Sequence, residues 1–327
     1  MAVALGHACH FWTGDWFTCN PIFKSQVLSM VTIWLNSFHI YAFTLISGYL
    51  FTYITLRGGY SNYWSFLKAK AKRLLIPYVF VMPIWAAPIS SYFLKMDDVD
   101  LFKNFVLCVN PRQLWFLWML FGVFAIVWPF RTVMIERPVA GWMIALAFCG
   151  IGYIGYHFIP NVFCIWTACQ YVIFFYIGMR MRVKSEQKER LITDVVPWYC
   201  WLTANIALLA GLEIIDLQSG FLGKVTMIGL KILLHVIGAI MAWTTLQVLA
   251  SRAHWQDCRA VDMLASYSMP MYLFHEQIIY FTIVTLNGVV NPWINAGANF
   301  VVAVAGSFLI SALLMRWKVT RFLIGEK

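Results

Sequence analysis

Long apolar segments alternate with short polar ones along almost the whole of this chain of 327 residues. The apolar runs are about 20 residues long and lack the strict polar and apolar alternation of a membrane β-barrel strand. Because helices and closed barrels are the structures that satisfy backbone polar groups in lipid, helices are predicted. The pattern predicts ten helices, at residues 1–12, 28–54, 74–94, 114–130, 139–157, 162–179, 197–217, 227–250, 268–288 and 298–316.

The distribution of Lys and Arg assigns the loops to the two sides of a membrane. With residues 55–73 in the cytoplasm, the loops on that side and the C-terminal tail carry 18 of the 24 Lys and Arg residues, and the opposite loops carry five. Cytoplasmic loops of membrane proteins are enriched in these residues. The split predicts a multi-pass protein of the cell membrane with both termini in the cytoplasm.

The first apolar segment is short for its predicted role. Residues 1–12 make about 18 Å of helix, whereas the hydrocarbon core of a bilayer is about 30 Å thick. A signal peptide is not expected, because the segment has neither a basic beginning nor a small-residue cleavage site. We therefore expect that the sequence begins inside a helix, through a misassigned start or a truncation.

Composition supports a membrane protein and excludes several other classes. The chain is 61% hydrophobic and 12% charged, with a mean hydropathy of +0.73, whereas soluble domains have about 25% charged residues. Residues 1–327 are expected to form a single all-α polytopic domain. The net charge is +10, but the positively charged residues flank apolar segments, so the charge does not indicate nucleic-acid binding. The eight cysteines lack paired spacing, so neither a disulfide framework nor a metal site is predicted.

Two histidines stand out in the first segment, LGHACHFW. His7 and His10 are three residues apart and would share one helical face. A histidine inside a membrane is a functional candidate, and its ordinary pKa suits a general base near neutral pH. The alternative is a pair that only packs helices together. The second predicted helix holds His39, Ser47 and Gly48. Ser47 and Gly48 either face a cavity or let helices approach closely, and His39 either faces a cavity or is a hydrogen-bonded structural residue.

A basic cluster follows, and two later helices carry further polar or aromatic candidates. Lys70, Lys72 and Arg73 precede LLIPY and are expected at a helix start, where the helix dipole would also favour phosphate. The alternative is a topology anchor or a contact with anionic lipids. Trp115 lies at the start of the fourth predicted helix. It either belongs to the aromatic belt at the membrane interface or lines a cavity. His275 lies beside Glu276 in the ninth, but neighbouring helical residues point about 100° apart and need not touch.

Several separated patches together resemble the acyltransferase 3 family of integral membrane O-acyltransferases. They match its motifs in order and spacing over nearly the whole chain. The patches are LGHA, FHIYAFTLISGYLF, KAKRLLIPY, LWFLWML, FFYIGM and SMPMYLFHEQI.

The resemblance implies a membrane enzyme that moves an acyl group, most often acetyl, from acyl-CoA to a hydroxyl of a cell-surface carbohydrate or glycolipid. His7 matches the catalytic histidine of the family, and Lys70 and Arg73 match its donor-binding basic pair. Lys in place of the first Arg loses a bidentate fork, which Lys72 is expected to offset. The expected cavity-lining residues are His10, His39, Ser47, Trp115, Tyr272 and His275. No permanently bound cofactor or metal is expected.

One departure from the family pattern concerns the start of the chain. The family has an Arg about ten residues before the first-helix histidine, and here that position would precede Met1, in line with the expected truncation. Two other functions stay open. One is an exporter of polysaccharide or lipid-linked sugar, and the other is a catalytically inactive member of the family.

Overall fold

The computed structural model describes residues 1–14, 16–59, 62–214, 220–252 and 259–326, and this part of the chain is helical with no strand. The α-helices are α1 (Ala2–His10), α2 (Gln26–Asn36), α3 (His39–Leu56), α4 (Tyr63–Val81), α5 (Ala87–Leu94), α6 (Asp98–Leu101), α7 (Trp115–Glu136), α8 (Pro138–Phe158), α9 (Ile165–Glu186), α10 (Ile192–Val195), α11 (Trp198–Ile214), α12 (Gly220–Arg252), α13 (Arg259–Leu286), α14 (Pro292–Leu314) and α15 (Lys318–Leu323). Short 3₁₀ or π segments are η1 (Phe11–Thr13), η2 (Met82–Ala86), η3 (Phe102–Val106), η4 (Arg112–Leu114) and η5 (Val162–Cys164). The all-α prediction is confirmed.

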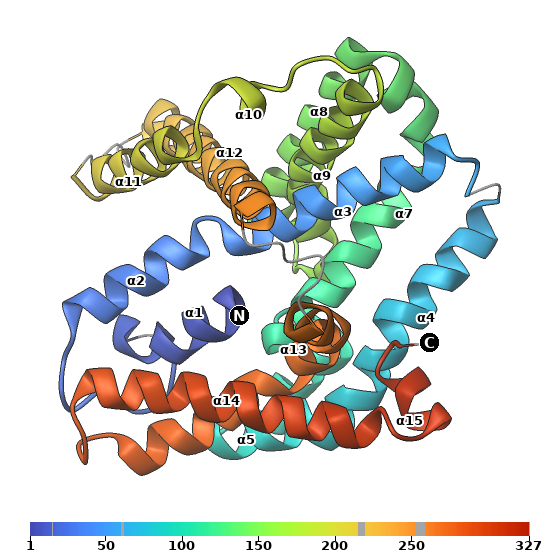
Figure 1. Ribbon diagram of the computed structural model, residues 1–327. Coiled ribbons are helices and arrows are strands. Elements are labelled where there is room, and N and C mark those ends of the chain that lie inside the picture. The colour runs from blue at the N-terminus through green and yellow to red at the C-terminus, as the bar shows by residue number, and fades with distance from the viewer. Residues whose placement is uncertain (15, 60–61, 215–219, 253–258, 327) are drawn as a thin grey trace.

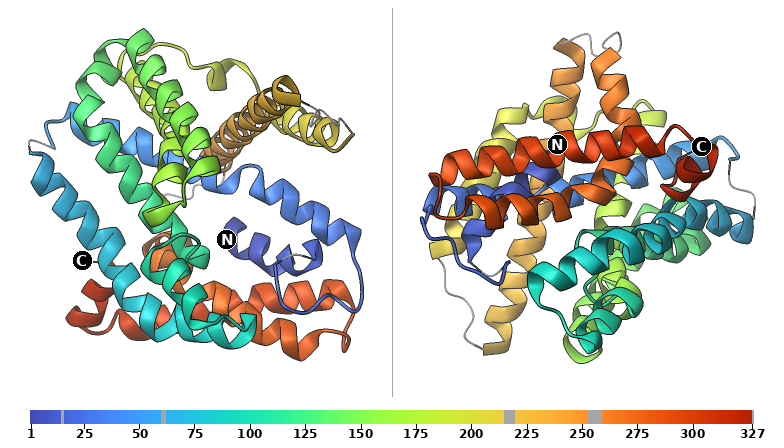
Figure 2. Two further views of the ribbon diagram at one scale, coloured as in Figure 1. Left: turned by 180° about the vertical axis from the view of Figure 1, so that it is seen from behind. Right: turned by 90° about the horizontal axis from the view of Figure 1, so that it is seen from below.

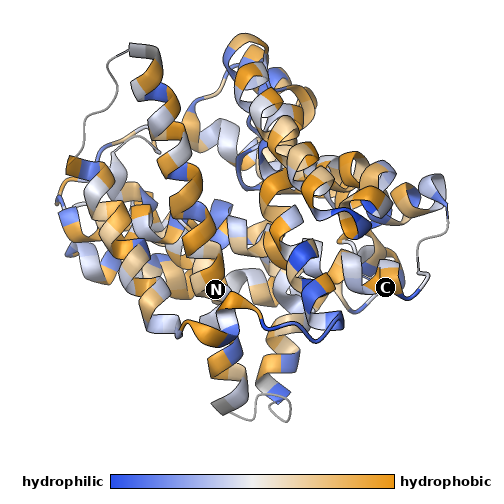
Figure 3. Cartoon of the chain, turned by 90° about the horizontal axis from the view of Figure 1, so that it is seen from above, coloured by the Kyte–Doolittle hydropathy of each residue, from blue (hydrophilic) through white to orange (hydrophobic). Residues whose placement is uncertain are grey.

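The number of apolar helical segments also follows the prediction. Seven segments of the described chain are long and apolar enough to cross a membrane: Gln26–Leu56, Tyr63–Leu94, Arg112–Glu136, Pro138–Phe158, Val162–Glu186, Leu222–Ser251 and Pro292–Leu314. Helices α1, α11 and α13 coincide with the other three predicted segments. Large apolar side chains are exposed along many of these helices, so hydrophobic residues cover the outside as well as the interior (Figure 3). The chain is a polytopic membrane protein.

The second predicted helix is interrupted, and residues of the neighbouring α11–α12 hairpin form hydrogen bonds with the residues at the interruption. Residues 28–54 were expected as one helix, but Ser37 and Phe38 separate α2 from α3. The His235 Nδ1–H on α12 donates to the Ser37 carbonyl at 2.9 Å. Asn205 on α11 accepts from the Trp34 indole at 3.1 Å and donates to the Leu234 carbonyl at 3.3 Å. These bonds satisfy polar groups that lipid would leave unpaired.

The third predicted helix begins earlier than expected. Asn62 caps α4, since its side chain accepts from the Ser65 backbone N–H at 3.1 Å. The expected start near residue 74 is therefore wrong, and Lys70, Lys72 and Arg73 lie inside the helix, away from its N-terminal dipole. The run alternates Lys with Ala, and both are strong helix formers, which explains why the helix extends beyond the apolar segment.

Helices α3 and α9 approach each other through a reciprocal pair of glycines. A Cβ added at Gly48 would lie 1.9 Å from the Phe175 carbonyl oxygen, and one added at Gly178 would lie 1.9 Å from the Leu45 carbonyl oxygen. Each glycine thus leaves room for the backbone of the other helix. The interpretation of Gly48 as a close-packing residue accounts for this contact.

Longer helices lie around the short helix α1 (Figure 1). Helix α1 lies between α2 and α14 and also contacts α13, while α15 returns to pack on α4. The α11–α12 hairpin stands at one side and contacts α3 through α12 (Figure 2). The first segment therefore packs both on α2, which follows it in the sequence, and on α13 and α14, which come from the other end of the chain.

Cysteine labelling tests the predicted orientation. Cys19 is exposed in the predicted outer loop between α1 and α2. In a Cys258→Ser background, we expect a membrane-impermeant maleimide to label intact cells through Cys19, and Cys19→Ser to remove that labelling. Cys108 lies on the same predicted side but is buried, and burial raises the pKa of its thiol to about 11, so it should stay unlabelled. Labelling of Cys19 only after permeabilisation would reverse the orientation.

Candidate functional site

His7 lies between two polar residues of α13. Its Nδ1 is 3.0 Å from the Glu276 Oε2, and its ring centroid is 5.0 Å from that of His275. His275 and Glu276 are 3% and 1% exposed, so the site is almost closed to solvent. The two neighbours on α13 point in different directions, yet both reach His7 because α1 packs across this turn. A buried carboxylate needs such a partner, since desolvation of an unpaired charge is costly.

Other side chains hold this pair in place. The Tyr280 hydroxyl donates to the Glu276 Oε1 one helical turn further along α13. Asn299 on α14 donates to the Ala8 carbonyl at 3.2 Å, which anchors α1 next to His7. Trp16 stacks on His10 with ring centroids 5.1 Å apart and meets His7 edge-on at 5.9 Å. The imidazole of His7 is therefore fixed on several sides.

The hydrogen bonds of two neighbouring histidines fix their tautomers. The Nδ1 of His275 is 2.8 Å from the Tyr272 carbonyl, and the Nδ1 of His39 is 2.6 Å from the Leu35 carbonyl. A carbonyl accepts only, so each Nδ1 carries the proton and each neutral ring keeps a lone pair on Nε2. The Nε2 of His275 is buried without a hydrogen-bond partner among the described residues. This nitrogen can accept a hydrogen bond from a bound hydroxyl.

The start of α7 is bonded to the same turn of α13. Gln113 donates to the Leu273 carbonyl at 3.2 Å and exchanges amide hydrogen bonds with Gln277 at 2.6 and 2.9 Å. The Tyr272 hydroxyl donates to the Gln113 carbonyl. The rings of Tyr272 and His275 are 5.8 Å apart. This buried network joins the predicted residues Tyr272 and His275 to the segment that leads into Trp115.

The predicted donor-binding residues lie elsewhere, on α4. Lys72 and Arg73 are exposed, while Lys70 is half-buried with its Nζ 4.0 Å above the Phe124 ring of α7. Gly325, after α15, packs on the Arg73 carbonyl. The Phe124 ring belongs to α7, whereas the groups nearest to the His7 ring, His275 and Glu276, belong to α13. The structure brings His10, His39 and His275 close to His7 or its helix, and it places the basic cluster on another helix, α4.

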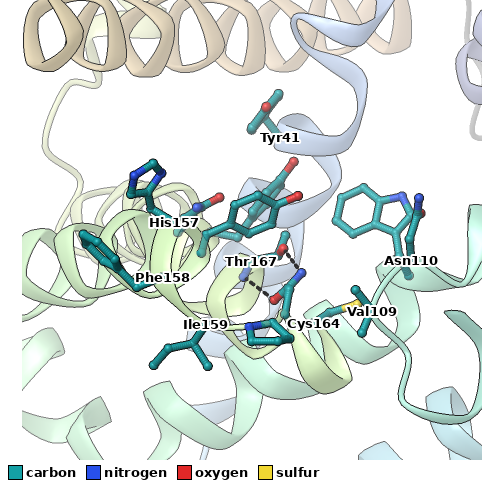
Figure 4. A pocket seen from close by; sticks show the side chains of 14 residues that line it. Tyr41, Val109, Asn110, His157, Phe158, Ile159, Cys164 and Thr167 are labelled. Carbon is teal, nitrogen blue, oxygen red and sulfur yellow. Dashed lines mark hydrogen bonds between the residues drawn. The ribbon is translucent and has the colours of Figure 1, made fainter. Parts of the chain in front are cut away.

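A cavity of about 740 Å³ lies beside the end of α8 and the start of α9. The distribution of Lys and Arg predicts that these helix ends face the outside of the cell. In Figure 4, His157 and Phe158 lie on one side, Asn110 and Val109 lie on the other, and Tyr41 lies above them. Of the predicted cavity residues, Trp115 is among those that line it. Ser47 instead donates to the Phe43 carbonyl of its own helix at 2.9 Å.

Glu276 and Tyr280 are the residues of this cluster that the sequence analysis left out of the site. A signal existed, because Glu276 is the one acidic residue between Asp262 and Glu326, and Tyr280 follows it by one helical turn. Gln277 directly follows Glu276 and belongs to the same polar group within the apolar run, whereas Trp16 and Gln113 carried no comparable signal.

The chain matches a known family of proteins. Residues 1–316 match the profile of a family described as an acyltransferase domain, Acyl_transf_3. Neither the curated proteins nor the solved structures gave a match. A match over nearly the whole chain, joined to the multi-pass helical fold, shows that the protein belongs to the acyltransferase 3 family of membrane acyltransferases.

Proposed function

We propose that this membrane acyltransferase moves an acyl group, most often acetyl, from acyl-CoA to a hydroxyl of a cell-surface carbohydrate or glycolipid. The observation that carries the proposal is the contact between His7 and the buried Glu276. A carboxylate beside one imidazole nitrogen leaves the other nitrogen free to act as base toward a hydroxyl.

The proposed step conserves atoms and charge. In the proposed step, the His7 Nδ1, which lies 3.0 Å from the Glu276 Oε2, carries a proton, and the Nε2 takes the proton of the acceptor hydroxyl. The hydroxyl oxygen attacks the thioester carbonyl, a C–O bond forms, and the C–S bond to CoA breaks. The protonated His7 returns its proton to the leaving thiolate, and Glu276 stabilises the imidazolium in between. The lone pair of His275 offers a second acceptor to orient the hydroxyl.

A transfer assay tests this function. The purified protein in proteoliposomes receives acetyl-CoA with a labelled acetyl group, together with the glycolipid and polysaccharide fraction of the source cells. We expect the label in a base-labile ester of that fraction and one free CoA thiol per ester formed. Saccharide crossing the membrane without release of CoA would instead support the exporter.

The basic residues of α4 are expected to bind the phosphates of the donor. Lys70→Ala combined with Arg73→Ala should weaken CoA binding by about tenfold or more, because each hydrogen bond to a charged group contributes about 1.5–3 kcal/mol. Isothermal titration of the detergent-solubilised protein with CoA measures the affinity. Lys188→Ala combined with Arg190→Ala removes the same two charges from an exposed segment of the same predicted side and should leave it unchanged. Equal effects of the two double variants on CoA affinity would show that the basic residues of α4 do not bind the donor.

A further inference from the structure

The cavity beside α8 and α9 has a chemical character that differs from that of a CoA site. Its 14 lining residues include no Asp, Glu, Lys or Arg. The phosphates of CoA would find no counter-charge there, and a cationic ligand would find no carboxylate. The polar lining groups include the neutral side chains of Asn110, Asn161, Thr167 and Gln170, with His157 at the rim. Asn161 donates to the Thr167 hydroxyl at 2.8 Å and Gln170 donates to the Gly152 carbonyl at 3.2 Å, so a ligand would meet their remaining donors and acceptors.

Aromatic rings form much of the remaining wall. Tyr41 is stacked between Tyr171 at 5.1 Å and His235 at 3.9 Å, and Trp115 meets Tyr171 edge-on at 5.8 Å. These ring contacts hold Tyr41, Tyr171 and Trp115 against their neighbours in this part of the wall. At the rim, Tyr156 and Phe158 are 58% and 76% exposed and present ring surface to a ligand.

We propose that this cavity binds a neutral saccharide unit of the acceptor. Sugar rings combine polarised C–H faces, which pack on the negative face of aromatic rings, with hydroxyls that bond amides and other hydroxyls. The cavity provides both, and its volume of about 740 Å³ lies in the usual range of about 300–1,000 Å³ for ligand sites. The inference rests on the proposed function for the identity of the acceptor.

The cavity is connected through the chain to the residues around His7, as a binding site for the acceptor would require. Trp115 lies in its wall and follows Gln113, which bonds to Tyr272 and Gln277 on the turn of α13 that carries His275. On the other side, Tyr41 follows His39, whose Cε1 lies 3.9 Å from the position of a Cβ added at Gly6. Two segments of the chain therefore run directly from the cavity to the cluster around His7.

Binding without any donor tests the site independently of catalysis. We would measure saturation-transfer NMR of maltotriose, and of the matched pair methyl β-glucopyranoside and methyl β-glucuronide, with the protein in lipid nanodiscs. We expect the neutral sugars to bind, and the glucuronide to bind about tenfold more weakly than the glucoside, because its charge has no partner in the cavity. Absence of neutral-sugar binding, or preference for the glucuronide, would overturn the assignment.

Two exposed rim residues allow the site to be mapped with little risk to folding. Tyr156→Ala and Asn110→Ala should each weaken maltotriose binding by about tenfold, through loss of an aromatic face or an amide. Tyr92→Ala is the matched control, because Tyr92 is a 79% exposed tyrosine outside the cavity lining. An equal effect of Tyr92→Ala would place the sugar elsewhere. Sugar binding without acyl transfer would contradict the proposed function alone, and acyl transfer without sugar binding would contradict the cavity alone.

Discussion

Glu276→Gln is expected to lower the turnover of acyl transfer by about 10²–10⁴-fold, the usual contribution of general acid–base catalysis. The amide keeps the size of the side chain and the hydrogen bond from Tyr280, but it removes the negative charge beside the Nδ1 of His7. Without that charge, the imidazolium formed during the reaction loses its stabilising partner, and the His7 tautomer is no longer fixed. The loss should fall on kcat, while CoA binding stays as in the unchanged protein.

The same pair can be tested by its non-additivity. His7→Gln alone should be at least as damaging, and the double variant His7→Gln/Glu276→Gln should be no worse than His7→Gln, because the two groups act as one unit. Release of the CoA thiol, followed over a range of acetyl-CoA concentrations, gives both kinetic constants. Glu213→Gln, at an exposed position on α11, removes a carboxylate of the same kind and should have no effect. Full turnover of Glu276→Gln would exclude the pair from catalysis.

Gly48→Ala is expected to disrupt the contact between α3 and α9. The added methyl would meet the Phe175 carbonyl oxygen at 1.9 Å, and that atom belongs to backbone, which cannot rotate away as a flexible side chain can. The helices must separate, and the buried rings between them lose contact. Overpacking of this kind costs about 1–3 kcal/mol and occasionally more. Gly178→Ala should act in the same way from the opposite helix.

A thermal unfolding series in detergent measures this effect. Gly150→Ala on α8 is the matched control, because a Cβ there meets nothing within 4 Å. Alanine favours a helix over glycine by about 1 kcal/mol, so Gly150→Ala should leave the unfolding temperature unchanged or raise it. An unfolding temperature of Gly48→Ala equal to that of Gly150→Ala would show that the close approach of α3 and α9 does not support the fold.

The spans could be predicted from the sequence because lipid leaves few choices. An apolar run of about 20 residues must be a helix there, and Lys and Arg mark its ends. The break at Ser37 could not be predicted in this way, since it depends on His235 and Asn205, which come from distant segments. The early start of α4 was missed because hydropathy reports where lipid begins, whereas Asn62 marks where the helix begins.

The candidate site was predictable in part for the same reason. His7 and His275 were visible as costly polar residues within apolar runs, and the resemblance added a role for His7. Their proximity depends on the packing of α1 across α13, which no local pattern encodes. Glu276 was noticed beside His275, but only the packing shows that it reaches His7. The contact of Lys70 with the Phe124 ring of α7 likewise depends on the tertiary arrangement.

The hydrogen bonds at the break between α2 and α3 bear on how this protein can be shortened for biochemical work. The α11–α12 hairpin stands at the periphery and looks dispensable in outline, yet it supplies the partners of the Ser37 carbonyl and the Trp34 indole. Its excision would expose both groups to hydrocarbon, where water offers no replacement. A minimal version of this protein must therefore retain the hairpin, and loop trimming is better directed at segments that carry no such bonds.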